Sequence, residues 1–333
     1  MRELAKVLKV SVATVSKALN NSHEISETTK EKVLEAASRL HYTINPYASS
    51  LRNKKSKTIA VILPEVADNF FSLAINGIQS VAEKIGYHLL IYLSHEKLKN
   101  EISIIEDCKS GRVDGVLISV SSETSNADHL LKLQQENIPI VFFDREFEGP
   151  KISKVVTNDF ECGNIAAMHL LGNGCKRLVF LSISSCLAIC RKRADGFSAA
   201  LREKKAGQTS NIVILDAETK EDIHSEIRKL LTSENRPDGI VASVERLAMS
   251  VYLVCKEIDM TIPDQLKVVV FSTIETAPIL DPPLTTITQP AFEIGRTAAE
   301  LLFKKIKKKT SNLTIETIVL PSVLMERRSS GGL

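Results

Sequence analysis

The sequence lacks the features of several large classes of protein. No apolar run among its 333 residues reaches membrane-spanning length, and the chain does not open on a basic-then-apolar signal peptide. Its six cysteines form no Cys-x-x-Cys pair and are few for this length, which indicates reduced thiols in a cytoplasmic protein. Phosphate loops, nucleophile elbows and His-Glu-x-x-His motifs are missing too. We therefore expect no enzyme, no metal, no cofactor and no membrane partner.

Positive charge is concentrated at the start of the chain. Residues 1–57 hold eleven Lys and Arg against five Glu, a net charge of +6. The whole chain carries only +3, so residues 58–333 carry −3. A basic head on a slightly acidic body is typical of a protein that binds nucleic acid.

The stretch VSVATVSKALN at 10–20 predicts a short amphipathic helix, preceded by a first helical segment at Glu3–Lys9. Ser11 suits its N-cap, and one apolar stripe contains Val15, Ala18 and Leu19. The opposite face carries small, polar or cationic side chains: Ala13, Thr14, Ser16, Lys17 and Asn20. Such a face fits a DNA major groove, although paired short helices also occur in proteins that never touch DNA.

A third helix is expected to close a small core with the first two. It begins after an N-cap at Ser26, and its apolar positions are Val33, Ala36, Ala37 and Leu40.

The segment NPYASSLR at 45–52 suits a helix of about two turns, because Asn45 is a good cap and Pro46 fits a first turn. Its small residues would let it enter a minor groove, with Leu51 as a wedge between base pairs. An ordinary linker with one stray leucine is the alternative that composition favours.

The rest of the chain alternates strand-like and helical patterns. Two series of apolar, β-branched runs are expected to be strands: Thr58–Leu63, His88–Leu93, Gly115–Ser119, Ile138–Phe143, then Arg177–Ser182, Asn211–Leu215, Gly239–Ala242 and Lys267–Ser272. This alternation predicts an α/β fold with doubly wound parallel sheets, and the length requires two lobes. A ligand would lie in the cleft between them, beyond the carboxyl ends of the strands.

Four parts of the chain follow from these patterns. We expect a helix-turn-helix head at 1–44 and a hinge helix with linker at 45–57. The first lobe should span 58–155 plus about 285–314, and the second 156–284 plus about 315–328. The last segments, at Leu284–Ile287, Ala291–Lys307 and Ile315–Leu320, should cross between the lobes.

The ordered set of motifs resembles the lactose-repressor/galactose-repressor (LacI/GalR) family of bacterial transcription factors. The head carries VSVATVSKALN and ISETTKEKVLEAASRLHYTINPYASSLR, followed by the strand TIAVILP. Core stretches typical of the family then recur in order: DNFF, VDGVLIS, FFDRE, NDFECGNIAAMHLL, RADGFSAAL, IPDQLKVVVFS and DPPLTTITQPAFEIGRTAAELL. The resemblance covers essentially the whole chain and implies a core like that of periplasmic sugar-binding proteins. A solute-binding protein and an enzyme on a doubly wound fold are the rival interpretations.

The resemblance implies a ligand-responsive repressor that binds DNA as a homodimer or tetramer. Two heads would meet a pseudo-palindromic double-stranded operator, and a small-molecule effector in the core would control operator affinity. Val12, Ala13 and Lys17 would read base edges, while Ser11, Thr14, Ser16 and Asn20 would anchor phosphates. The hinge positions Tyr47, Ala48 and Leu51 would contact the minor groove.

Candidate effector-binding residues also follow from the resemblance. Phe70 and Phe71 stand where the family stacks an aromatic ring on its ligand, although core packing of the next helix is the alternative. Asp144, followed by Arg145, matches an acid that contacts the effector, and Arg193 matches an arginine that holds it. The acid and Arg193 would clamp a ligand or form a salt bridge between the lobes.

The sequence departs from the family near two strand ends. Val244, Glu245 and Ser250 stand where the family usually has Asn, Asp and Gly, and Ser272-Thr273 replaces an acidic pair. Glu245 and Ser272 are therefore further effector-site candidates. Losing acceptors for sugar hydroxyls predicts an unusual effector: an anionic metabolite, a less hydroxylated one, or none.

A third departure is at the start of the chain. Relatives place a Thr-Ile-Lys or similar lead before the first helix, and its Thr caps that helix. Here Met1 already lies at the helix edge with no Ser or Thr before it. The expectation is that the natural start lies upstream or that the chain has been trimmed.

Overall fold

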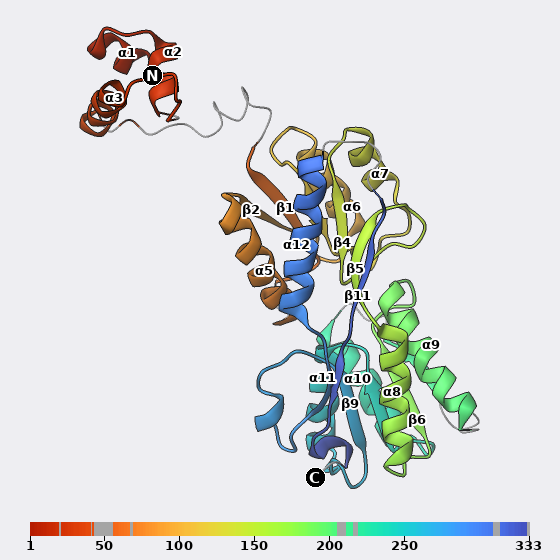
Figure 1. Cartoon of the computed structure of the whole chain (residues 1–333). Helices are drawn as coiled ribbons and strands as arrows, with labels where there is room; N and C mark the ends of the chain where they lie inside the picture. Colours follow the sequence, from red (N-terminus) through yellow and green to blue (C-terminus); the bar gives the residue numbers. More distant parts are fainter. Residues whose placement is uncertain are drawn as a thin grey trace. The chain divides into compact units, whose positions relative to one another are not determined.

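The computed structural model divides into two compact units, Met1–Ser56 and Lys57–Leu333 (Figure 1). The described residues are 1–19, 21–40, 42, 56–66, 69–204, 211–215, 219–308 and 314–331. The expected hinge helix over NPYASSLR, with Tyr47, Ala48 and Leu51, lies outside them, as does Asn20.

The described residues of the first unit form a three-helix head, as the sequence predicts. Its helices are α1 (Arg2–Leu8), α2 (Val12–Leu19) and α3 (Glu27–Arg39). The core between them contains Leu4, Ala5, Val15, Ala18, Val33, Ala36 and Ala37. One predicted core residue is wrong. Leu40 is 40% exposed, because α3 ends at Arg39 and its apolar stripe ends there too, while Tyr42 packs against the core.

The second unit contains two six-stranded sheets, one for each lobe. The first has the order β11-β5-β4-β3-β1-β2 and is parallel throughout. Its strands are β1 (Thr58–Leu63), β2 (His88–Leu93), β3 (Val116–Ile118), β4 (Ile140–Phe143), β5 (Ser153–Thr157) and β11 (Thr317–Leu320).

The second sheet has the order β12-β10-β9-β8-β6-β7, and only the β10–β12 pair is antiparallel. Its strands are β6 (Leu178–Ser182), β7 (Asn211–Ile214), β8 (Gly239–Ala242), β9 (Lys267–Phe271), β10 (Thr285–Thr288) and β12 (Val323–Met325). The eight strands of the two predicted series are all present, with ends shifted by two residues at most, whereas β5 and β12 were not predicted.

The placement of the last strands differs from the expectation. Strand β10, expected in the first lobe, pairs with β9 in the second sheet. Strand β11, expected in the second lobe, pairs with β5 in the first sheet. Strand β11 forms one edge of the first sheet, where Thr317 stands opposite Lys154 of β5, and β12 forms one edge of the second sheet, where it pairs with β10.

Helices cover both faces of each sheet. Odd and even residues of β1 contact different layers, because successive strand side chains point to opposite faces. In the first lobe, α5 (Asn69–Ala82) and α12 (Ala291–Lys308) cover one face, and α6 (Leu98–Cys108) and α7 (Asp128–Gln135) the other. In the second lobe the two layers are α8 (Asp159–Gly172) with α9 (Ala188–Glu203), and α10 (Lys220–Thr232) with α11 (Glu245–Glu257). Short 3-10 turns complete the chain at Glu83–Ile85, Ala277–Ile279 and Arg328–Ser330.

One helix pair in each lobe approaches unusually closely. Helix α12 runs beside α5 (Figure 1), where a Cβ on Gly77 would lie 2.0 Å from the Phe292 carbonyl oxygen. Helix α8 meets α9 in the same way, since a Cβ on Gly163 would lie 2.0 Å from the carbonyl oxygen of Arg193. Glycine is therefore needed at both crossings for the helices to touch backbone to backbone.

Among the described residues, no helix combines the length and the apolar character that crossing a membrane would need.

Candidate functional site

The head presents one face of α2 to solvent. The Thr14 N–H donates to Ser11 Oγ at 3.0 Å, which confirms Ser11 as the cap of this helix. Val12 is 43% exposed and Ala13 and Lys17 are exposed as well, whereas Val15 and Ala18 are buried in the core. The predicted base-reading positions therefore lie together on an accessible helix face.

The predicted position of Ser16 on that face is wrong. Ser16 is only 5% exposed, because α2 packs against both α1 and α3 and its buried arc is wider than the Val15–Ala18 stripe. Lys17 forms a short ion pair with Glu24 beside this face.

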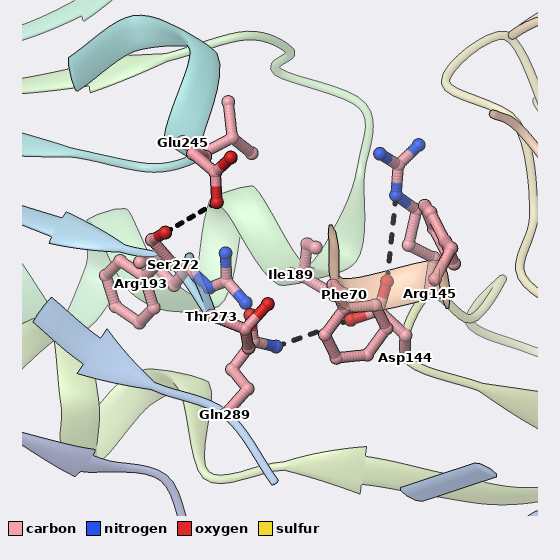
Figure 2. A pocket seen from close by; sticks show the side chains of 12 residues that line it. Phe70, Asp144, Arg145, Ile189, Arg193, Glu245, Ser272, Thr273 and Gln289 are labelled. Atoms are coloured by element: carbon pink, nitrogen blue, oxygen red, sulfur yellow. Dashed lines mark hydrogen bonds and ion pairs between the residues drawn. The ribbon is translucent and has the colours of Figure 1, made fainter. Parts of the chain in front are cut away.

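The second unit contains a pocket of about 390 Å³, its open mouth included. All six residues that the sequence proposed for an effector site line it: Phe70, Phe71, Asp144, Arg193, Glu245 and Ser272. They come from both lobes and converge from strand ends and helix starts (Figure 2).

Aromatic rings form the apolar part of the pocket. Phe70 and Phe71 lie in the first turn of α5 with ring centroids 5.3 Å apart, edge to face. Both are buried and belong to the first lobe's core, which confirms the core-packing interpretation, while stacking on a ligand stays a prediction. On the opposite lobe, the ring of Phe271 lies 4.1 Å from the Arg193 guanidinium carbon.

Asp144 follows β4 directly and is held by its backbone. Its φ of 60° places it in the left-handed region, and its N–H donates to the Val155 carbonyl oxygen at 3.0 Å. Gln289 Nε2 donates to Asp144 Oδ1 at 3.4 Å, and Arg145 Nε lies 3.9 Å from Asp144 Oδ2 (Figure 2). This strained and buried turn aims the carboxylate at the pocket.

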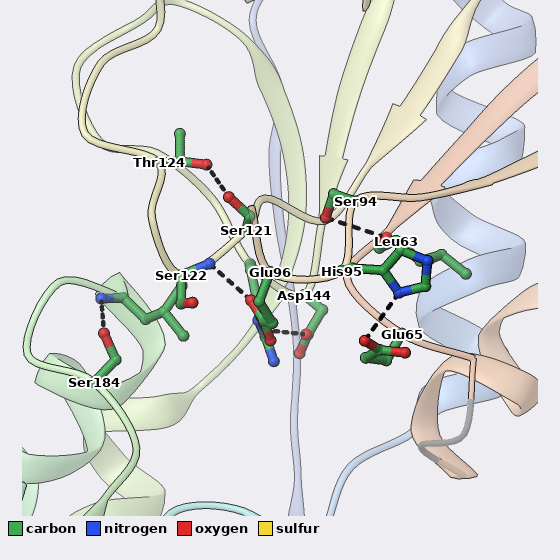
Figure 3. A network of polar contacts seen from close by, with 12 residues as sticks. Leu63, Glu65, Ser94, His95, Glu96, Ser121, Ser122, Thr124, Asp144 and Ser184 are labelled. Atoms are coloured by element: carbon green, nitrogen blue, oxygen red, sulfur yellow. Dashed lines mark hydrogen bonds and ion pairs between the residues drawn. The ribbon is translucent and has the colours of Figure 1, made fainter. Parts of the chain in front are cut away.

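Arg145 is bound by an acid of its own lobe. Its Nη1 donates to both carboxylate oxygens of Glu96, at 2.8 and 3.0 Å. Glu96 also accepts the Ser122 N–H at 2.8 Å (Figure 3). Burial raises the pKa of Glu96, but the charge and hydrogen bond of Arg145 outweigh it and hold that pKa below its ordinary value of 4.5. The guanidinium charge is therefore already compensated within the first lobe.

Arg193 is compensated in the same way within the second lobe. It is 2% exposed, its Nε donates to Asp159 Oδ1 at 2.7 Å, and its Nη1 donates to the Ser243 carbonyl oxygen at 2.7 Å. Of the two alternatives for Asp144 and Arg193, the salt bridge between the lobes is wrong, whereas the clamp on a ligand stays a prediction. Its ion-pair partner is an acid at the start of α8, which the Gly163 crossing brings against α9.

Glu245 begins α11 and accepts a hydrogen bond from the Ser272 hydroxyl at 2.6 Å. Six further lining residues were not among the candidates, although the sequence analysis noted three of them beside candidates: Arg145, Val244 and Thr273, and in addition Ile189, Phe271 and Gln289. All but Ile189 lie at or just beyond the carboxyl end of a strand, so the strand-end rule applied to every strand would have found five of them.

Comparison with known proteins covers both units. The model of bacterial regulatory proteins of the lacI family matches residues 1–45, and that of periplasmic binding proteins and the sugar binding domain of the LacI family matches residues 56–322. The chain is 30% identical over 312 residues to the HTH-type transcriptional repressor PurR of Photobacterium profundum, covering 93% of this chain and 92% of that protein. It is 30% identical over 332 residues to the ribose operon repressor of Halalkalibacterium halodurans, covering 100% and 97%.

A solved structure shares the fold of the core. The LacI family transcriptional regulator from Enterococcus faecalis, with bound ribose, is 26% identical with a TM-score of 0.72, covering 82% of this chain and 98% of that chain. A solute-binding protein would leave the match at 1–45 unexplained, and both relatives are transcriptional or operon repressors. The chain belongs to the lacI family of bacterial regulatory proteins, with a DNA-binding head and a core of the periplasmic-binding type.

Proposed function

We propose that the protein is a dimeric cytoplasmic repressor whose affinity for a pseudo-palindromic operator is controlled by a small metabolite bound in the core pocket. The observation that carries the proposal is the exposed, capped face of α2 in one unit, together with one pocket in the other that contains all six candidate effector residues. A dimer supplies two heads for two half-sites, and the effector shifts the population of DNA-competent dimers.

In the head, Val12, Ala13 and Lys17 meet base edges of the major groove. Ser11 and Thr14, whose hydroxyls lie 2.9 Å apart at the start of α2, are placed for phosphate contacts. Ser16 is buried and is therefore left out of the proposed phosphate contacts. Because Val12 and Ala13 offer no hydrogen bonds, phosphate contacts, DNA shape and a Leu51 wedge supply much of the specificity.

Leu51→Ala is expected to weaken binding to the promoter fragment beside the protein's own gene far more than binding to unrelated DNA. A wedge acts only where the duplex kinks, whereas phosphate contacts serve any sequence. Electrophoretic mobility shifts with both fragments measure the two affinities. Leu34→Ala is the matched control, since Leu34 lies in α3 of the head with 55% exposure, and it should leave both affinities unchanged. Equal losses on both fragments for Leu51→Ala contradict the wedge.

The charges around the pocket favour an uncharged effector over an anionic one. Arg145 and Arg193 line it, but each is paired with a carboxylate of its own lobe. Asp144 and Glu245 line the pocket as well. Together with the two ion-pair partners, Glu96 and Asp159, four carboxylates therefore stand against two guanidinium groups at and around the pocket. We infer an uncharged hydrogen-bond donor with a flat apolar face, such as a sugar or a nucleobase, because a phosphate or carboxylate would add repulsion.

Isothermal calorimetry with matched pairs tests this inference. We expect an uncharged sugar such as D-ribose to bind at least about tenfold more tightly than its 5-phosphate, a difference of about 1.4 kcal/mol. Nucleobases extend the panel of uncharged ligands. Tighter binding of the phosphorylated member of a pair would overturn the inferred ligand class while leaving the DNA-binding proposal intact.

A further inference from the structure

Two oppositely charged segments meet across the lobes beside the pocket. Glu146 and Glu148 lie in the loop after β4 of the first lobe, and Arg191 and Lys192 lie in α9 of the second. Lys192 Nζ is 2.6 Å from Glu146 Oε1, and Arg191 Nη2 is 2.7 Å from Glu148 Oε2. Lys192 Nζ also lies 3.7 Å from Glu148 Oε1. We call these four residues the clasp.

Glu146 is the centre of the clasp. It is 3% exposed and has one lysine partner from each lobe, Lys192 of α9 and Lys154 of β5, the latter in a short contact. Burial raises the pKa of this carboxyl, but the hydrogen bonds and charges of the two lysines lower it by more than that. The net effect is a pKa below the ordinary value, so Glu146 is ionised at neutral pH. A buried carboxylate depends strongly on its partners, whereas the half-exposed Glu148–Arg191 pair contributes little.

The clasp adjoins the pocket without lining it. Glu146 follows the lining residues Asp144 and Arg145 along the chain, and Lys192 directly precedes Arg193. The Glu146–Lys192 contact therefore joins the segment that carries Asp144 and Arg145 to the segment that carries Arg193. At the pocket itself, Asn69 Nδ2 of the first lobe donates to the Thr273 carbonyl oxygen of the second at 2.5 Å.

We propose that Glu146 and Lys192 are positioning residues that hold the two lobes at the observed angle. The clasp makes the effector pocket partly preformed, so a ligand does not have to supply all the free energy of bringing the lobes together. That the clasp affects regulation by an effector rests on the proposed function. That it holds the two lobes together does not.

The two lysines of Glu146 provide a matched test in the full-length protein without ligand or DNA. Lys192→Gln removes the partner in the other lobe, and Lys154→Gln removes the partner in the same lobe. Hydrogen exchange measured by mass spectrometry reports on pocket-lining segments of other elements, at 69–71, 243–245 and 271–274. We expect several-fold faster exchange there in Lys192→Gln and wild-type exchange in Lys154→Gln, because only the first loosens the lobes.

Lys192→Arg keeps the charge and should restore wild-type exchange. If Lys192→Gln leaves the three segments unchanged, or if Lys154→Gln accelerates them equally, the clasp does not hold the lobes and the proposal is overturned. Neither result bears on operator binding, so failure of the clasp is distinguishable from failure of the proposed repressor function.

Discussion

Replacing Asp159 by alanine is expected to lower the free energy of unfolding by about 3–5 kcal/mol. Asp159 accepts the Nε hydrogen bond of Arg193 at 2.7 Å, and both side chains are only 2% exposed. Without the carboxylate, a guanidinium charge is left in the interior of the second lobe, where it keeps the hydrogen bond to the Ser243 carbonyl oxygen but has lost its ion-pair partner. Urea denaturation followed by circular dichroism measures the loss.

A double-mutant cycle separates the stranded charge from lost packing. Asp159→Ala combined with Arg193→Met should recover part of the stability lost in Asp159→Ala, because the uncompensated charge is gone. Glu226→Ala is the surface control, since the Glu226–Lys229 pair is 51% and 70% exposed and its loss should cost less than about 1 kcal/mol. If the loss of unfolding free energy in the double variant equals the sum of the two single losses, Asp159 does not stabilise the protein by compensating the Arg193 charge.

Gly163→Ala is expected to destabilise the second lobe at the upper end of the range for overpacking, about 3 kcal/mol or more. The added Cβ would lie 2.0 Å from the carbonyl oxygen of Arg193, and backbone cannot move aside as a flexible side chain can. Relief requires α8 and α9 to separate, which would also pull Arg193 away from Asp159 and from the pocket. The same substitution should therefore lower both the free energy of unfolding and the affinity for the effector.

Gly172→Ala is the matched control in the same helix. Gly172 ends α8, and a Cβ there meets nothing within 4 Å. Alanine should leave stability unchanged or raise it by as much as about 1 kcal/mol, since it restricts the unfolded chain and favours the helix. Equal denaturation midpoints for the Gly163 and Gly172 variants would contradict the close helix crossing.

Much of the candidate site could be predicted, because its residues follow strand ends that the sequence marks clearly. Asp144 and Ser272 come directly after apolar runs that form β4 and β9, and Phe70 opens the helix after β1. Gln289 was missed because β10 continues to Thr288, beyond the predicted end at Ile287. Arg145 was noticed only as the neighbour of Asp144, since its partner Glu96 lies in a loop 49 residues earlier.

Local patterns in the sequence by themselves determined the helical head, the Ser11 cap, the doubly wound core and the family, because caps, periodicity and motifs are encoded within a few residues. Tertiary structure alone decided that Ser16 is buried, and that β10 lies in the second sheet and β11 in the first. It also decided the ion pairs of Arg193 with Asp159 and of Lys192 with Glu146. These outcomes depend on which segments meet after long crossovers and on how closely glycine lets two helices approach. These long-range contacts also set the charge of the pocket, because they decide which carboxylate is paired with each cationic side chain in and beside it.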